Sequence, residues 1–394
     1  MDEDAAWREY LDALEDVRRQ TLAQPFAQES DRSRAQALFY LQSLHARAFN
    51  LAVAPRQDYP RFLKNLFFEP LTYMQNLPSP DFIYHFALVN GARRFRIHGR
   101  RHNVHWIDIQ VMNGYYGDRE IRRLANYDLD DFAMAPDGSF RITVSADRQP
   151  GNWIGIDPAS ANNAIVVRQA TYDWDNERLA ELHIEADDGE RPDTMAFSVT
   201  EMNRRLRLAA ERMRFECRNF GAVTVPRLLR EFGTNRFFNE LGTGEKSTNP
   251  GAAYVQAVYE LREGEALIVR TEVPMARYWS IHLGDLWFQT TDFTYHQSSL
   301  NGHQARLDAD GLFRGVIALA DPGVPNWIDP AGTAKGTIML RWYHADRHPL
   351  PEIERVPLAH LREHLPADTP VVAPAERAEV LKRRERASLR YYGY

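Results

Sequence analysis

A repeated sequence pattern constrains the fold of this chain more than any other feature. Residues 137–141 (DGSFR) recur at 310–314 (DGLFR), and the PG and NWI of residues 150–154 recur within residues 322–328. The offset is 173 residues for the first motif and 174 for the tryptophan of the second. Internal repeats reflect repeated structural units, so the pattern indicates that one unit occurs twice.

Two further pairs of residues follow the same spacing. Arg168 and Arg341 are 173 residues apart, and so are Trp106 and Trp279. Both copies are rich in β-branched and aromatic residues and are interrupted by turn signals, which indicates short strands joined by turns. We therefore expect two strand-rich lobes in tandem.

The first copy opens with a strand pattern. Residues 82–89 and 93–98 flank Asn90-Gly91, the dipeptide most typical of a tight β-hairpin turn. Residues 105–112 are a third candidate strand. These signals predict a hairpin followed by a further strand.

Helical patterns precede, separate and follow the two copies. Ser30 is placed to cap a helix in the first region, and Thr200 to cap a helix in the connector. The last helix, residues 375–392, carries apolar side chains that we expect to dock on a neighbouring molecule, which would give a homo-oligomer. The expected regions are a helical N-terminal region (1–80), a first β lobe (81–190), a helical connector and loop (195–250), a second β lobe (251–345), and a C-terminal linker and helix (346–394).

Composition excludes several classes of protein. The chain is 44% apolar and 26% charged with a formal net charge of −6, so neither nucleic acid nor a membrane is an expected partner. No apolar run approaches the roughly 20 residues of a membrane span, and the acidic N-terminus is unlike an export signal, so we expect a cytoplasmic protein. Cys217 is the single cysteine, which excludes disulfides and thiolate metal sites.

The second copy resembles a known family. Residues 278–280 (YWS), 321–329 (DPGVPNWID) and 341–342 (RW) resemble the family catalogued as domain of unknown function 1214, and weaker similarities extend the resemblance to about residues 70–345. The resemblance implies β-sandwich, jelly-roll-like lobes with added helices, and no established reaction. The predicted fold class is therefore mainly β with added helices (α+β), with two tandem antiparallel β-sandwich lobes. Arg101-His102 departs from the family pattern.

Residues shared by both copies favour a structural role. In each copy Pro-Gly supplies a turn, the asparagine can satisfy exposed backbone groups, and the tryptophan can fill the core of the lobe. Arg168 and Arg341 are expected to pair with Asp157 and Asp329. Arginine is also the natural receptor for a carboxylate or sulfate ligand, which leaves an anion site as the alternative.

Function is then expected where the copies differ, above all in residues 281–304. On a strand through residues 279–283, His282 lies on the face opposite Trp279, so one face meets a core and the other can line a pocket. A histidine beside an aspartate can act as a general base, and a tyrosine can donate to a substrate oxygen. The candidate catalytic residues are His282, Asp285, Tyr295 and His296. Ordinary surface and hydrogen-bonded core histidines are the alternative.

Aromatic and polar residues around this segment are candidates for binding the substrate. A tryptophan or tyrosine offers an apolar wall with a hydrogen-bonding group at its edge. The candidate substrate-binding residues are Tyr278, Trp287, Asn301, Trp327 and Arg341.

Two other motifs have alternative interpretations. His98, His102 and His105 are candidate metal ligands, but Arg100 and Arg101 stand between them and favour a solvated basic turn. Residues 240–247 (ELGTGEKS) resemble the end of a phosphate-binding loop but lack its first glycine, so we interpret them as a flexible loop that covers a site.

These observations lead to two functional hypotheses. The first is an enzyme, of hydrolase or lyase type and without a cofactor, that acts on a lipophilic small molecule such as a steroid, terpenoid or aromatic compound by acid/base chemistry in an apolar pocket between the lobes. The second is a non-catalytic binding or carrier protein that uses the same pocket. A repeat-built interaction scaffold, with a broad apolar surface in place of a cavity, is a third possibility.

Overall fold

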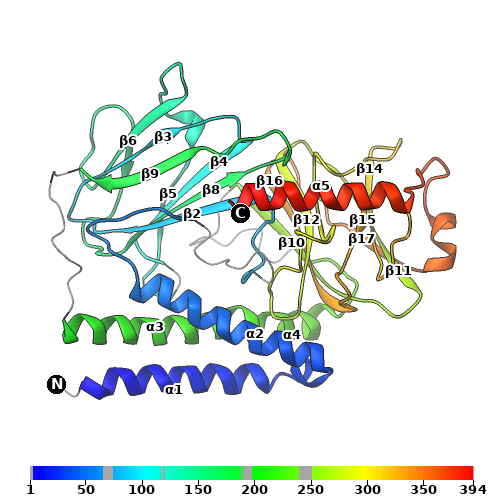
Figure 1. The fold of residues 1–394 in the computed structure, drawn as a ribbon, viewed down its shortest axis with the longest axis horizontal. Helices are drawn as coiled ribbons and strands as arrows, with labels where there is room; N and C mark the ends of the chain where they lie inside the picture. Colours follow the sequence, from blue (N-terminus) through cyan, green and yellow to red (C-terminus); the bar gives the residue numbers. More distant parts are fainter. Residues whose placement is uncertain are drawn as a thin grey trace.

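The computed structural model describes residues 3–64, 74–115, 117, 118, 120–187, 189, 198–238 and 251–393. Within these residues the chain is a mixed α+β protein, with 17 strands in four sheets and five α-helices. Figure 1 shows two β lobes side by side, a layer of helices along one side of both, and one long helix lying across them. The predicted α+β class with two β lobes is confirmed.

The first lobe contains two sheets packed face to face. One has the strand order β1-β2-β8-β4-β5 and the other β7-β6-β3-β9. The strands are β1 (Leu63–Lys64), β2 (Phe82–Val89), β3 (Phe95–Arg100), β4 (Trp106–Met112), β5 (Arg123–Asp128), β6 (Ser139–Ser145), β7 (Trp153–Gly155), β8 (Asn163–Ala170) and β9 (Glu181–Ala186). Every residue of β2 is buried, as expected for a strand covered on both faces.

The second lobe repeats this plan. Its sheets have the orders β10-β16-β12-β13 and β15-β14-β11-β17. The strands are β10 (Ala252–Glu260), β11 (Glu265–Glu272), β12 (Ala276–Gly284), β13 (Ser299–Asn301), β14 (Leu312–Ile317), β15 (Trp327–Ile328), β16 (Lys335–Ala345) and β17 (Glu352–Pro357). The sheet takes in β17, so the lobe continues beyond residue 345.

Apart from β1, each strand of the first lobe has a counterpart in the second lobe. The sheet order β2-β8-β4-β5 becomes β10-β16-β12-β13, and β7-β6-β3-β9 becomes β15-β14-β11-β17. Each lobe even keeps one parallel pair, β6 with β7 and β14 with β15, among antiparallel neighbours. The duplication predicted from the spacing of the motifs is confirmed.

One pair that matched in spacing does not match in structure. Trp106 pairs with Ala170 across its ladder, and the equivalent pair in the second lobe is Tyr278 with Tyr343. Trp279 therefore points to the opposite face from Trp106 and lies inside the second sandwich. Side chains alternate along a strand, so an alignment that is wrong by one residue exchanges the two faces.

The hairpin predicted at Asn90-Gly91 is wrong. β2 pairs with β8, whereas β3 lies in the other sheet and pairs with β6 and β9. The dipeptide instead makes the corner between the two sheets. A Cβ at Gly91 would lie only 1.9 Å from the Asp157 carbonyl oxygen, so the close approach of another loop requires this glycine.

The shared asparagines have the structural role that was predicted. Asn152 donates to the carbonyls of Ala133 and Arg141 and accepts from the Ala133 amide. Asn326 makes the same three bonds to the backbone of its own lobe. The prediction that the neighbouring tryptophans fill the sandwich cores is wrong, because the isoleucines that follow them do so.

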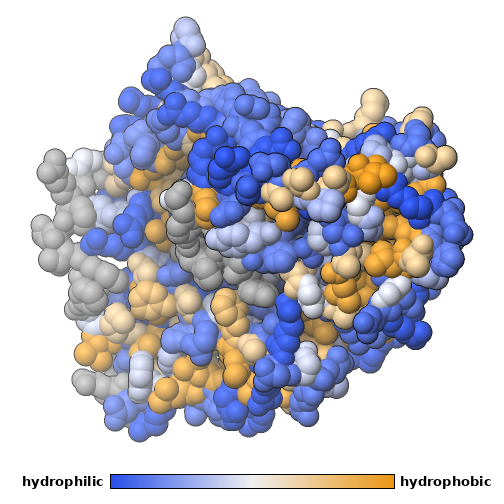
Figure 2. Space-filling model, turned by 45° about the vertical axis from the view of Figure 1, so that its right-hand side comes forward, coloured by the Kyte–Doolittle hydropathy of each residue, from blue (hydrophilic) through white to orange (hydrophobic). Residues whose placement is uncertain are grey.

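Four helices form the layer beside the lobes. They are α1 (Glu3–Leu22), α2 (Asp31–Ala48), α3 (Val199–Asn219) and α4 (Gly221–Phe232). Ser30 caps α2 as predicted, but α3 is capped by Ser198 and not by Thr200. The layer packs on the second lobe through a core that includes Trp287 and Met339. On the side drawn in Figure 2, hydrophobic residues are visible among the helices at the lower left, in keeping with exposed Trp7 and Leu11 on α1.

The C-terminal helix α5 (Pro374–Tyr392) ties the two lobes together. Arg377 binds Asp321 and the Val324 carbonyl in the second lobe. At the other end, the hydroxyl groups of Tyr391 and Tyr392 donate to the backbone just before and at the start of the first lobe. The helix thus docks on its own chain, and its terminal tyrosines are buried there. Homo-oligomerisation through this helix stays a prediction.

None of the helices in the described ranges has the length and apolar character that a bilayer crossing requires.

Candidate functional site

The two lobes meet through the outer faces of the β1-β2-β8-β4-β5 sheet and the β10-β16-β12-β13 sheet. Along β12, Trp279, Ile281 and Leu283 enter the second sandwich, whereas the side chains between them point outward, as the sequence predicted. The outward residues face the first lobe: the rings of Phe82 and Tyr278 lie 4.8 Å apart. A sheet face buried by another sheet becomes an internal compartment, and its polar residues must find partners there.

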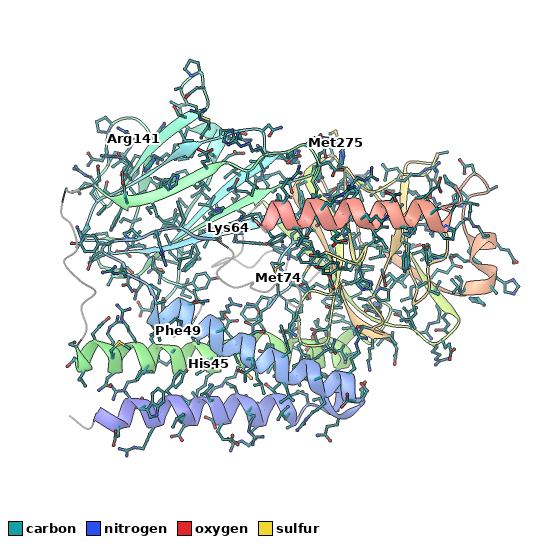
Figure 3. All side chains as sticks on the ribbon, in the orientation of Figure 1. His45, Phe49, Lys64, Met74, Arg141 and Met275 are labelled. Atoms are coloured by element: carbon teal, nitrogen blue, oxygen red, sulfur yellow. The ribbon has the colours of Figure 1, made fainter. Side chains whose placement is uncertain are left out.

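Aromatic rings form the walls of this interface. Tyr343 of β16 lies 5.3 Å from Trp106 and 5.5 Å from Phe82, measured between ring centroids. Its hydroxyl is 2.9 Å from that of Tyr254 on β10. Met74 lies where the segment before β2 passes between the lobes and the helical layer (Figure 3). The interface therefore combines large apolar surfaces with phenol groups.

An arginine lies on this face in each lobe. Arg168 on β8 is flanked by Tyr84 on β2 and Asp108 on β4, its partners in the ladder. Its guanidinium donates to Asp108 Oδ2 at 2.7 Å and to Gln110 Oε1 at 2.8 Å. The positive charge in the first lobe is therefore neutralised within the lobe.

Arg341 occupies the same position in the second lobe but has different partners. It is flanked by Tyr254 on β10 and Ser280 on β12. Its side chain is 5% exposed, and the hydrogen bond found for its guanidinium goes to the Leu77 carbonyl. Among the residues that the structure describes, no carboxylate lies within ion-pair distance of Arg341, and its Nε has no hydrogen-bond partner.

Several polar atoms beside Arg341 are buried without a hydrogen-bond partner among the described residues. They are Ser280 Oγ, His282 Nδ1 and Gln256 Nε2, and all three residues belong to the same sheet face. An unsatisfied buried polar group costs about 1–3 kcal/mol, so a cluster of them is unusual in a folded protein. We call Gln256, Ser280, His282 and Arg341 the Arg341 cluster.

The imidazole of His282 is held in its neutral form. Burial lowers the pKa of His282 well below its usual value, and the Arg341 guanidinium lowers it further. Its Nε2 lies 3.4 Å from the Leu77 carbonyl oxygen, which can only accept a hydrogen bond. We therefore assign the proton to Nε2 and a free lone pair to Nδ1. This nitrogen can accept a proton.

The backbone beside the cluster is strained. Asn76 and Leu77 have φ angles of 67° and 45°, in the left-handed region that branched residues seldom adopt. The Leu77 amide donates to the Phe288 carbonyl at 3.0 Å, which holds the strained segment in place. A Cβ at Gly284 would come within 2.7 Å of the Leu77 side chain. Such strain gathers at functional sites, because the surrounding structure must be built to maintain it.

Comparisons with known proteins support the family resemblance. The family model described as "Protein of unknown function (DUF1214)" matches residues 261–347. The resemblance to DUF1214 is confirmed. This DUF1214 match runs from β11 to β16 and contains Ser280, His282 and Arg341, whereas Gln256 precedes it.

One solved structure, of an uncharacterised protein, has the same fold. A crystal structure from Burkholderia cenocepacia is 27% identical with a TM-score of 0.81, over 90% of this chain and 98% of that protein. A protein from Vibrio parahaemolyticus is 12% identical with a TM-score of 0.46, over 79% of this chain and 97% of that protein. No curated protein matches the chain.

Tyr278 and Asn301, which were expected to bind substrate, donate hydrogen bonds to the buried carboxylate of Asp81. Asp81 accepts hydrogen bonds from Tyr278 at 2.6 Å, Asn301 at 2.7 Å and Trp174 at 2.8 Å. Burial raises the pKa of Asp81, and these three donors oppose the rise. The Tyr391 hydroxyl of α5 donates to the Asp81 carbonyl. Tyr278 and Asn301 therefore join the two lobes and α5.

Asp285 and Trp287 also have structural contacts. The Asp285 carboxylate accepts from the amides of Trp287 and Gln289 and from the Gln289 side chain, so it closes its own turn and makes no hydrogen bond to His282. Burial raises the pKa of Asp285 to about 6. Trp287 stacks on Tyr40 of α2 at 5.5 Å in the core of the helical layer.

The remaining predicted residues of the DUF1214 match lie outside the Arg341 cluster. His296 pairs with Asp329 at 2.7 Å, and this partner raises the pKa of the half-exposed imidazole. Tyr295 is exposed. Trp327 donates to the Ala318 carbonyl and lies under the Arg377 guanidinium of α5. Of the four candidate catalytic residues, only His282 belongs to the cluster.

The predicted arginine partners are wrong. Arg168 binds Asp108, while Asp157 binds Arg122. Asp329 binds His296 and leaves Arg341 without a carboxylate. Asp157 and Asp329 both follow the repeated Asn-Trp-Ile motif, which suggested them as partners. The pairing of the strands places other residues beside the two arginines.

The three histidines proposed as metal ligands have separate partners. His98 stacks on His183 at 5.2 Å, His102 lies 3.0 Å from Glu181, and His105 contacts the Arg277 carbonyl. No group of three potential ligands was found anywhere in the described part of the chain. Residues 240–247, proposed as a covering loop, lie outside the described residues.

A cavity of about 400 Å³ is lined by α5, by the second lobe and by residues 173–175 of the first lobe. Its buried arginines are already bound: Arg377 to Asp321 and Gln297, and Arg384 to Ser299. Arg383 lies 3.8 Å from Asp175. This cavity thus lacks the unsatisfied groups that distinguish the Arg341 cluster.

Sequence analysis missed the importance of Asp108, Gln110 and Ser280. They could have been found by aligning the sequence of β4 with that of β12 at an offset of 172 residues. In that alignment Ser280 is the equivalent of Asp108, and His282 is the equivalent of Gln110. The tryptophan spacing suggested 173 and concealed this difference.

Proposed function

We propose that the protein binds a lipophilic small molecule between its two lobes, at the Arg341 cluster, and acts on it by proton transfer through His282. The observation that carries the proposal is the set of buried polar atoms of Arg341, Ser280 and His282 that find no partner in the part of the chain that the structure describes. Burial of such groups is costly, and a bound molecule would supply the missing hydrogen bonds.

The surroundings suit a molecule with an apolar body. Tyr254, Tyr343 and Phe82 present rings close to the cluster, and the Arg341 guanidinium lies 5.1 Å from the Tyr254 ring centroid. Aromatic walls with a few convergent polar groups are typical of small-molecule sites. Steroid, terpenoid and aromatic compounds all have an apolar body of this kind.

His282 suits acid/base catalysis. Its neutral imidazole can take a proton at Nδ1 from a substrate C–H or O–H group and return it later, while Nε2–H stays directed at the Leu77 carbonyl. Arg341 would stabilise negative charge that develops on the substrate. This step needs no organic cofactor, and it fits a lyase or hydrolase.

A non-catalytic carrier is the second candidate. The observation in its favour is that Asp285, His296 and Tyr295 do not join His282, so the cluster holds one proton acceptor without an aspartate to orient it. The two candidates differ in whether the bound molecule leaves chemically unchanged.

The test begins with the molecule that copurifies with the protein, identified by mass spectrometry of a denatured extract. The compound is then incubated with wild-type protein, His282→Gln and His85→Gln. His85 is a matched control, because it is a buried histidine of the first lobe whose pKa burial lowers to about 4. We expect conversion by the wild type and by His85→Gln, and a loss of about a hundredfold or more in His282→Gln.

Unchanged compound in every sample would favour the carrier. If His282→Gln converts the compound at the wild-type rate, His282 takes no part in the mechanism. A compound that binds equally well to wild type and Arg341→Gln would place the site elsewhere.

A further inference from the structure

We infer that the molecule bound at the Arg341 cluster carries a carboxylate, and that Arg341 and Ser280 bind this group. The inference rests on the proposed function and names the chemical class of its ligand. It comes from the comparison of Arg341 with Arg168, which occupies the same place in the first lobe.

The first lobe shows what an arginine at this position binds. Each arginine lies between a tyrosine and one residue of the next strand, and that residue is Asp108 for Arg168 and Ser280 for Arg341. Asp108 is 3% exposed and lies 2.7 Å from its arginine. The duplicated frame thus holds a carboxylate beside the guanidinium in one copy and omits it in the other.

Burial makes the omission costly. An ion taken out of water loses hydration worth several kcal/mol, which a neighbouring opposite charge normally repays. Arg341 is 5% exposed, and in the described part of the chain its guanidinium meets a neutral carbonyl, that of Leu77, where Arg168 meets a carboxylate. A carboxylate ligand would supply the missing charge.

The difference in size points the same way. Serine is smaller than aspartate, so the change from Asp108 to Ser280 removes a carboxyl group from the face and leaves a hydroxyl that no described residue binds. His282 replaces Gln110, whose side-chain oxygen accepts from Arg168. A ligand carboxylate in the place of the Asp108 carboxylate would accept from both Arg341 and Ser280, and the planar guanidinium fork suits two carboxylate oxygens.

A ligand carboxylate would compete with the Leu77 carbonyl of the strained segment for the Arg341 guanidinium. The Leu77 carbonyl contacts Arg341 and lies 3.4 Å from His282 Nε2, and Leu77 has a φ of 45°. A charged acceptor binds a guanidinium more strongly than a neutral carbonyl does, so the ligand would replace Leu77 at Arg341. The aromatic rings around Tyr254 would then cover its apolar body, and the ligand is a lipophilic carboxylic acid.

Calorimetric titration with three acids tests the inference. Decanoate, 4-phenylbutyrate and cholate represent a chain, an aromatic ring and a steroid, and their primary amides are matched neutral probes. We expect at least one acid to bind the wild type about tenfold or more tightly than its amide, because a hydrogen-bonded buried charge pair is worth more than the neutral bond.

Ser280→Asp places a carboxylate beside Arg341 as Asp108 stands beside Arg168. We expect this variant to have a higher Tm than the wild type without ligand and to bind the acids about tenfold or more weakly. Ser280→Asn is the matched control, because it adds the same bulk without the charge, and its Tm should not rise.

The outcomes separate the inference from the proposed function. If the amides bind the wild type as tightly as the acids and Ser280→Asp weakens both equally, the carboxylate inference is overturned and the site stands. If the amides bind and the acids do not, the carboxylate inference is likewise overturned and the site stands. If no acid and no amide binds, both are overturned. Equal Tm values for Ser280→Asp and Ser280→Asn would also contradict an uncompensated charge on Arg341.

Discussion

The two lobes have the same strand order but differ in how they neutralise a buried arginine. In the first lobe Arg168 is bound by Asp108 and Gln110, while in the second Arg341 stands beside Ser280 and His282. The frame around both arginines is the same ladder of three strands. Duplication therefore kept the scaffold and freed one copy of its internal counter-ion, which is the origin we suggest for a binding site.

The largest expected effect concerns the counter-ion of the first lobe. Asp108→Ala leaves Arg168 buried without a charge partner, so we expect a loss of about 3–5 kcal/mol in the free energy of unfolding. Ser280→Ala removes a hydroxyl that has no partner, and we expect a change within about 0.5 kcal/mol. Urea unfolding of both variants measures the difference. Similar losses at the two positions would end the distinction between the lobes.

A smaller and more even effect is expected at the shared asparagines. Asn152→Ala and Asn326→Ala each remove three hydrogen bonds to the backbone of their own lobe. We expect losses of about 1–3 kcal/mol, with the larger loss at Asn326 because it is the more buried. Urea unfolding again measures this, with Gln149→Ala on the exposed loop as the control. A neutral result at either asparagine would contradict the shared structural role.

The smallest expected effect is on the pH dependence of stability. His282 has a pKa far below that of an unfolded histidine, so the unfolded chain binds a proton that the folded chain refuses. The pH-dependent part of its burial cost is therefore absent above about pH 6.5 and destabilises the protein as the pH falls below that value. Gln110 holds the same place in the first lobe and does not titrate. His282→Gln should then lose less stability than the wild type between pH 7 and pH 5.5, by on the order of 1 kcal/mol.

The measurement is Tm against pH for wild type, His282→Gln and the exposed-site control His360→Gln. His85 also has a lowered pKa and is present in all three proteins, so part of the loss of stability at low pH remains in each of them. Parallel curves for wild type and His282→Gln would show that His282 binds its proton at the same pH in the folded and the unfolded protein, which would contradict the lowered pKa of the buried imidazole.

Prediction from sequence succeeded where the signal was local. The Asp-Gly and Pro-Gly turns place Gly138, Gly151, Gly311 and Gly323 at positive φ in both lobes, and the asparagines bind the backbone beside these turns. The alternation along β12 also followed from the chain itself, since successive side chains of any strand point to opposite faces. These features depend on a few neighbouring residues, which the sequence displays directly.

Prediction failed where partners come from distant parts of the chain. Asn90-Gly91 has the composition of a hairpin turn, yet β2 pairs with β8, and the dipeptide turns the chain between sheets. Tyr278 and Asn301 looked like ligand-binding residues, but Asp81, about two hundred residues earlier, takes their hydrogen bonds. A polar side chain looks free until its partner is known.

The sequence by itself determined that the chain contains one β unit twice, with helices between and around the copies, because the repeat and the turn residues are local and countable. Only the tertiary structure decided which residue faces each arginine across the ladder. Register depends on contacts between strands that are some sixty residues apart, and a shift of one residue exchanges the buried faces. The difference between Asp108 and Ser280 is therefore written in the sequence but becomes visible only when β4 and β12 are in place.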